Sequence, residues 1–166
     1  MFQAARDFPT PINEPVLSYG PGTAEREELK ATLEVLSKET WEMQSVINGE
    51  RISTTNNMTL KSPHDLSQTL GTIHMVDGEL TSRAIENALS AKRGWMEMSL
   101  EDRGAILLKA ADLLTGPYRA RMNAATMMGQ SKTAHQAEID SACELADFWR
   151  FNVQFAKQLT KDQPYS

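Results

Sequence analysis

The sequence predicts an α+β chain in which β structure comes early and helices follow. Three observations support this class. A Pro- and Gly-rich arm covers residues 1–22, two hairpin patterns fall within residues 44–76, and helical apolar spacing continues over residues 81–161. We therefore expect one unit at residues 1–40, an arm and a helix, and a second at residues 41–166, with two antiparallel hairpins and four to five helices.

The N-terminal arm is expected to run extended over a surface. Four prolines and two glycines within 22 residues disfavour both helix and internal strand, so the segment needs other parts of the chain to lie on. A helix is predicted at about 24–39. Thr23 can cap it, the acidic residues of its first turn suit the helix dipole, and Leu29, Leu33 and Leu36 form an apolar stripe.

Two hairpins are predicted next. Asn48-Gly49 lies between short β-prone runs, and this dipeptide favours a two-residue turn in which both central residues have positive φ. A second antiparallel pair is predicted from residues 58–61 and 70–76, which flank a loop rich in Ser, Pro, His and Asp.

The helical part contains recognisable starts and stops. The first helix is expected to begin near Thr81 and to end near Gly94. Ser99, followed by Asp102, resembles a capping box, and Gly116-Pro117 predicts a stop and a new start. A further helix is expected to reach Met128 and to break at Gly129. The last helix, 133–161, is the longest uninterrupted pattern, with an apolar face widened by aromatic residues.

Charge and hydropathy exclude several classes of function. A net charge of −5, a pI near 5.2 and the lack of a Lys/Arg run argue against nucleic acid or an anionic membrane as partner. No apolar stretch has the length of a membrane span, and residues 1–11 resemble neither a signal peptide nor a transit peptide. We therefore predict no nucleic-acid partner, no membrane partner and a cytoplasmic location.

No residue pattern predicts a catalytic, cofactor-binding or metal site. Cys143, the single cysteine, lies mid-helix without a neighbouring His or cation and is interpreted as a core residue. The three histidines are dispersed, without a pair at metal-ligand spacing. Residues 129–133 superficially resemble a phosphate loop, but they lack the preceding strand and the Gly before Lys132, so a helix–helix turn is favoured.

The last predicted helix carries four acidic residues, one of which differs from the others in its surroundings. Asp140, Glu144 and Asp147 share one side, which we interpret as a solvated face. Glu138 falls among apolar residues, and a carboxylate there needs a partner or a function. The residues alone favour a non-catalytic helical interaction or assembly module over a self-sufficient enzyme.

Several short segments of the sequence resemble the corresponding segments of a known protein family. The chain is similar to the N-terminal part of the pyrroline-5-carboxylate dehydrogenases, a branch of the aldehyde dehydrogenase superfamily. The resemblance covers nearly the whole chain and is most specific at Gln136-Ala137-Glu138-Ile139-Asp140 and Arg150-Phe151-Asn152. It also includes residues 13–16, 24–26, 46–49, 84–86, 108–114, 116–117 and 163–164.

The resemblance implies an N-terminal fragment of an NAD-dependent enzyme that oxidises L-glutamate 5-semialdehyde to L-glutamate in proline catabolism. Residues 41–166 would then belong to the NAD-binding domain of an α/β fold. The catalytic cysteine and the main NAD loops would lie downstream, so the fragment is expected to be inactive and to bind no NAD tightly. Its partners would be the rest of the dehydrogenase chain and further copies in a homo-oligomer. Glu138 matches a family acid at the mouth of the aldehyde site, which implies a substrate-binding role.

Overall fold

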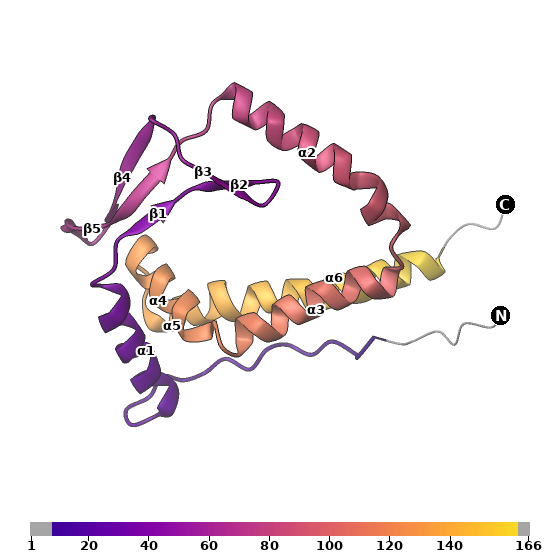
Figure 1. The fold of residues 1–166 in the computed structure, drawn as a ribbon. Helices are drawn as coiled ribbons and strands as arrows, with labels where there is room; N and C mark the ends of the chain where they lie inside the picture. Colours follow the sequence, from indigo (N-terminus) through magenta and orange to yellow (C-terminus); the bar gives the residue numbers. More distant parts are fainter. Residues whose placement is uncertain (1–7, 163–166) are drawn as a thin grey trace.

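The computed structural model describes residues 8–162, so the first seven residues of the predicted arm and the Gln163-Pro164 motif lie outside the described residues. The predicted α+β class is confirmed (Figure 1). The helices are α1 (Ala24–Leu36), α2 (Gly78–Glu97), α3 (Leu100–Thr115), α4 (Arg119–Gln130), α5 (Ala134–Ala137), the π-helix η1 (Glu138–Cys143) and α6 (Glu144–Lys161). The strands are β1 (Trp41–Met43), β2 (Ser45–Ile47), β3 (Glu50–Ile52), β4 (Asn57–Ser62) and β5 (Asp65–His74).

Both predicted hairpins are confirmed. β2 and β3 pair antiparallel across Asn48 and Gly49, whose φ values of 53° and 79° are the positive pair that a two-residue turn requires. β4 and β5 pair antiparallel as well, but β5 begins at Asp65. The predicted loop between them is therefore wrong, and only a short turn at residues 63–64 separates the strands.

The three-stranded sheet contains a strand that the sequence pattern did not predict. β1 pairs parallel with β5, in the order β1-β5-β4, and places Trp41 opposite Gly71. Its three residues are too few to show an alternation of apolar and polar positions. The close approach depends on Gly71, because a Cβ there would lie 2.1 Å from the backbone oxygen of Trp41.

Helix ends agree with the predictions at some positions and differ at others. Ser99 caps α3 by accepting a hydrogen bond from the Asp102 amide, as predicted. Thr23 precedes α1 but donates its hydroxyl to the carbonyl of Gly20, and α1 ends at Leu36 rather than near residue 39. The helices predicted to end near Gly94 and to break at Gly129 run slightly further, to Glu97 and Gln130, and α2 begins at Gly78 rather than near Thr81. Ser131, with φ of 57°, is the left-handed residue that ends α4.

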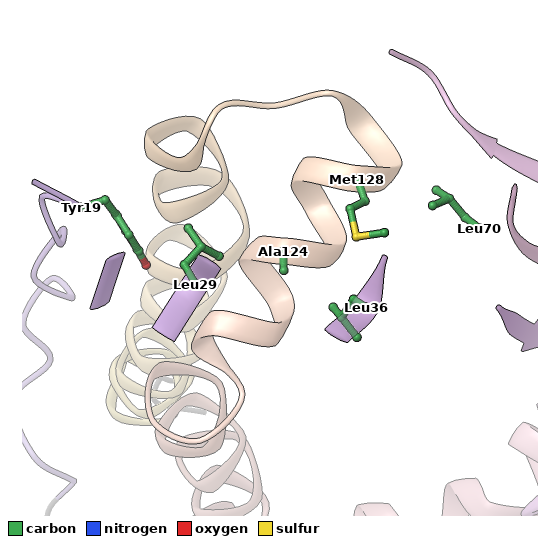
Figure 2. Close-up of a cluster of buried hydrophobic side chains, with 6 residues drawn as sticks. All are labelled: Tyr19, Leu29, Leu36, Leu70, Ala124 and Met128. Atoms are coloured by element: carbon green, nitrogen blue, oxygen red, sulfur yellow. The ribbon is translucent and has the colours of Figure 1, made fainter. Parts of the chain in front are cut away.

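Two small hydrophobic cores hold the described residues together. The first joins the arm, α1, β5 and α4, and Figure 2 shows its six buried members, Tyr19, Leu29, Leu36, Leu70, Ala124 and Met128. The second lies between α3 and α6 and contains Ala111, Leu114 and Ala146, with Leu145 and Trp149 packed against them. By contrast α2 has no buried residue and stands apart from the other helices over most of its length (Figure 1). No helix among residues 8–162 is long and apolar enough to cross a membrane.

The close contact at Gly71 generates a first prediction. Gly71→Ala should lower the free energy of unfolding by about 1–3 kcal/mol, because its methyl group must displace the backbone of β1. Gly78→Ala is the matched control, since nothing lies within 4 Å of its added carbon and Ala suits the start of α2. Urea unfolding followed by circular dichroism measures both. Equal stability of the two variants would contradict the predicted clash.

Candidate functional site: a buried ionic cluster

The predicted site residue, Glu138, opens the π-helical segment of the last helix. Thr133 caps that helix in a reciprocal capping box with Gln136, and the winding then widens over Glu138–Cys143. The Glu144 amide donates to the carbonyl of Ile139, five residues back. This winding stacks residue 143 on residue 138, and the Cys143 Sγ lies 3.6 Å from the Glu138 Oε1. The prediction of one uninterrupted α-helix is therefore wrong at these six residues.

The carboxylate of Glu138 is fully buried, and both of its oxygens are occupied. Oε1 accepts from the Leu17 amide at 2.8 Å and from Nη2 of Arg119. Oε2 accepts from the Tyr19 hydroxyl and from Nδ2 of Asn123, each at 2.8 Å, and from Nε of Arg119 at 3.3 Å. Four residues from the arm and from α4 thus satisfy one buried charge.

Arg119 connects this carboxylate to the N-terminal arm. Its Nη1 donates to Oε1 of Glu14 at 2.6 Å, and its Nη2 donates to the carbonyl of Pro15 at 2.7 Å. Arg150, on α6, donates its Nη1 to the other oxygen of Glu14, also at 2.6 Å. The cluster therefore contains two carboxylates and two guanidinium groups, and its formal charge is balanced.

The cluster shifts the pKa values of its members. Burial opposes ionisation of Glu138, but hydrogen bonds from Arg119, Leu17, Tyr19 and Asn123 outweigh it and hold the pKa at about 2. Burial, together with the neighbouring carboxylate, raises the pKa of the Tyr19 hydroxyl. The same two causes raise the pKa of the Cys143 thiol to about 11. Glu138 is thus ionised at neutral pH, whereas Cys143 is a protonated thiol.

The other acidic residues of this helix differ in their surroundings. Glu144 is exposed, and Asp140 is partly exposed and paired with Lys132. Asp147 is not simply solvated as predicted, because its carboxylate accepts from the Asn13 side chain and from the Glu14 amide, each at 2.7 Å. Asp147 therefore binds the N-terminal arm to α6.

The role predicted for Cys143 is confirmed, although one premise was wrong. The residue is buried, with 4% of its surface exposed. A cation does lie beside it, since Nη2 of Arg119 is 3.5 Å from its sulfur. Desolvation and Glu138 together outweigh that cation, so its thiol lacks the lowered pKa that a nucleophile needs.

Sequence reasoning missed five members of the cluster, which are Glu14, Tyr19, Arg119, Asn123 and Arg150. They come from the arm, α4 and α6, and more than a hundred residues separate Glu14 from Arg119 in the chain. The one usable signal was local: an acid placed among apolar residues at position 138 required a cationic partner.

Metal and cofactor sites were tested on the described residues. Among residues 8–162 no group of three His, Cys, Asp or Glu side chains is placed to hold a metal ion. His74 bonds instead to Glu42 and to the backbone of Thr54, and His64 bonds to Ser131. Residues 131–133 form the predicted turn between α4 and α5, and a helix rather than a strand precedes them. They therefore do not fit the phosphate cradle of a nicotinamide nucleotide.

A groove of about 660 Å³ runs beside the cluster. One wall comes from the arm and the other from η1 and α6, where Phe148 and Phe155 are 56% and 49% exposed. Its lining residues are Asn13, Glu14, Val16, Ile139, Asp140, Cys143, Glu144, Asp147, Phe148, Phe151, Asn152 and Phe155.

The class of protein follows from a comparison with known families. Residues 51–165 match the aldehyde dehydrogenase family, and the chain belongs to that family. Its relatives are pyrroline-5-carboxylate dehydrogenases, as the sequence resemblance predicted. The chain is 48% identical over 158 residues to the Delta-1-pyrroline-5-carboxylate dehydrogenase of Agaricus bisporus. The aligned residues are 95% of this chain and 29% of that protein. The mitochondrial enzyme of Homo sapiens is 41% identical over 154 residues, 93% of this chain and 27% of that protein.

Solved structures agree with the sequence relatives. The Delta-pyrroline-5-carboxylate dehydrogenase of Mycobacterium tuberculosis matches with a TM-score of 0.95 and 41% identity, over 100% of this chain and 31% of that one. A variant of the Thermus thermophilus enzyme matches with a TM-score of 0.83 and 26% identity, over 98% of this chain and 31% of that one. The chain thus spans about three tenths of the length of these relatives.

The depressed pKa of Glu138 generates a second prediction. A carboxyl group whose pKa falls from 4.5 to about 2 on folding contributes stability that is fully present above pH 4.5 and is lost as the pH falls toward 2. The full contribution is on the order of 3 kcal/mol. Urea unfolding at several pH values between 6 and 3 should show it.

Glu138→Gln serves as the comparison for this pH effect, because it keeps the shape of the side chain and removes the titration. Its free energy of unfolding should fall less steeply with acid than that of the wild type. Parallel curves for the two proteins would show that Glu138 does not titrate with a depressed pKa.

Proposed function

We propose that this chain is the N-terminal part of an NAD-dependent dehydrogenase that oxidises L-glutamate 5-semialdehyde to L-glutamate. The observation that carries the proposal is the match of nearly the whole chain to pyrroline-5-carboxylate dehydrogenases, at 48% identity in sequence and a TM-score of 0.95 in structure. A solved relative from Mycobacterium tuberculosis has NAD bound. NAD would accept the hydride, and water would supply the second carboxylate oxygen.

The chemical groups of that reaction have no counterpart among the described residues. Cys143 is buried and protonated, and it does not suit attack on an aldehyde. We therefore propose that the nucleophile and the NAD loops correspond to the part of the longer relatives that this chain does not match. Residues 41–166 would form part of the NAD-binding domain.

The partner of this chain is then the remainder of the dehydrogenase, and further copies of the enzyme would complete a homo-oligomer. Exposed apolar side chains on two helices support the first of these partners. On α2, Ile85, Leu89 and Met96 are 56%, 62% and 64% exposed, and on α6 Phe148 and Leu159 are 56% and 67% exposed. The rival proposal, a separate interaction module, has no comparable support. The cytoplasmic location stays a prediction, and several relatives are named as mitochondrial.

The reaction assignment gives a third prediction. The 166-residue chain should show no NADH formation above background with pyrroline-5-carboxylate and NAD, because it lacks the nucleophile. If the reading frame continues past Ser166, the longer protein should form NADH, measured by absorbance. A longer protein that is folded and binds NAD but is inactive would overturn the assignment. Turnover by the 166-residue chain would show that the catalytic nucleophile lies within these residues.

We further propose, from the family resemblance, that Glu138 takes part in substrate binding in the complete enzyme. Its two oxygens are filled by the arm and α4 in this structure, so a substrate contact requires one of these bonds to be exchanged.

The fourth prediction is that Glu138→Gln lowers both the melting temperature and the turnover of the longer enzyme, the latter at temperatures at which the variant is still folded, because it leaves Arg119 without its charged partner and removes the charge that would meet the substrate. Steady-state kinetics and a thermal melt measure the two effects. Tyr19→Phe is the matched variant, since it removes one hydrogen bond to the same carboxylate and keeps the charge. An unchanged rate for Glu138→Gln would remove the residue from the site.

A further inference from the structure

The arm from Pro9 to Tyr19, here named the strap, is attached to the body mainly by polar contacts. It pairs with no strand, and in Figure 1 it runs along the side of the molecule formed by α3 and α6. At its C-terminal end Tyr19 is buried in the first core and Leu17 packs against that core, whereas Ile12 and Val16 are 72% and 49% exposed. Apolar contact is thus concentrated at the two ends, at Leu17 and Tyr19 and at the preceding Phe8, whose ring lies against Gly104 of α3, and little apolar burial opposes detachment of the residues between them.

One ionic latch holds the middle of the strap. The Glu14 carboxylate lies between the guanidinium groups of Arg119 and Arg150, at 2.6 Å from each. The three side chains are 13%, 11% and 18% exposed, so the contacts are shielded from water. Charge-assisted hydrogen bonds of this kind are the strongest polar contacts that a surface segment can make.

The latched strap covers two groups of the buried cluster. The Pro15 carbonyl lies 3.8 Å from the sulfur of Cys143, and the Leu17 amide and Tyr19 hydroxyl close off the carboxylate of Glu138. Hollows lie on both sides of the strap. The groove described above borders Asn13 to Val16, and a second hollow of about 450 Å³ lies between residues 9–15 and α3, where Leu108 and Asp112 line it.

The strap also has a hinge at its C-terminal end. Tyr19 has a φ of 51°, which is unusual for a side chain of its size, and a turn follows in which the Thr23 amide donates to the Gly20 carbonyl. Gly22, with φ of 81°, completes the turn before α1. Rotation at these few residues moves the strap without disturbing the helix.

We propose that the strap is a hinged cover that opens without unfolding of the helices, and that the Glu14 latch determines how often it opens. Opening removes the Pro15 carbonyl from the Cys143 thiol and the Leu17 amide from Oε1 of Glu138, and it joins the two hollows into one. The proposal concerns this chain alone and does not depend on the dehydrogenase assignment. It also supplies a route by which a solute reaches a carboxylate that is closed in the resting structure.

Native-state labelling of Cys143 tests the proposal, because the sequence contains one cysteine. A thiol reagent such as 5,5′-dithiobis(2-nitrobenzoic acid) reacts at a rate set by the open fraction. Glu14→Gln and Arg150→Gln should each label about ten to a hundred times faster than the wild type, because Glu14→Gln removes the charge that both latch contacts share and Arg150→Gln removes one of the two contacts. Glu34→Gln, which removes an exposed carboxylate on α1, is the control and should label at the wild-type rate.

The dependence on urea separates local opening from unfolding. Opening of the strap exposes little surface, so labelling in low urea should change little with urea concentration. Chymotrypsin should cut after Leu17 or Tyr19 faster in both latch variants, with no new cut in α3 or α6. Wild-type labelling rates in the latch variants would overturn the proposal. Labelling that follows the steep urea dependence of global unfolding in every protein would overturn it too.

Discussion

The structure depends on the buried ion pair between Glu138 and Arg119. A carboxylate with no exposed surface is tolerated only because a guanidinium group, an amide, a phenol and a carboxamide surround it. Removing either charge leaves the other buried without its partner, which costs far more than the pair contributes as a unit. Each of the two charges can therefore be buried only when the other is present. The fold can bury this carboxylate only when the arm, α4 and the last helix come together.

The cluster also joins parts of the chain that apolar packing leaves separate. One core lies between the arm, α1, β5 and α4, and the other lies between α3 and α6. Arg119, at the first position of α4, contacts Glu14 in the arm and Glu138 in the last helix. The two small cores are thus oriented relative to each other by directional polar contacts. This explains how a chain with an exposed α2 and a thin sheet still fixes the position of its last helix.

Sequence reasoning succeeded where the cause was local. Asn48-Gly49 and Ser99 predicted their turn and cap because each effect acts within a few residues. It failed at β1, whose three residues are defined by a partner strand some thirty residues away, and it placed two helix ends slightly early, at Gly94 and Gly129, because a single glycine is tolerated inside a helix. Glu138 was noticed as an acid among apolar residues. Its partners in the arm could not be identified, since they lie about 120 residues away in the chain.

The π-helical segment fixes how the last helix tolerates changes in length. An α-helix turns by about 100° per residue, and a π turn accommodates one residue more than an α turn. The apolar pattern contains that extra residue as the step of five from Ala137 to Ala142, both fully buried. A one-residue deletion between 138 and 143 would restore α winding with little rotation of α6, so Val153 would keep its buried position, whereas the same deletion within α6 would rotate every later residue by about 100°. The π segment is thus the place where the last helix can lose one residue without turning its apolar face away from the core.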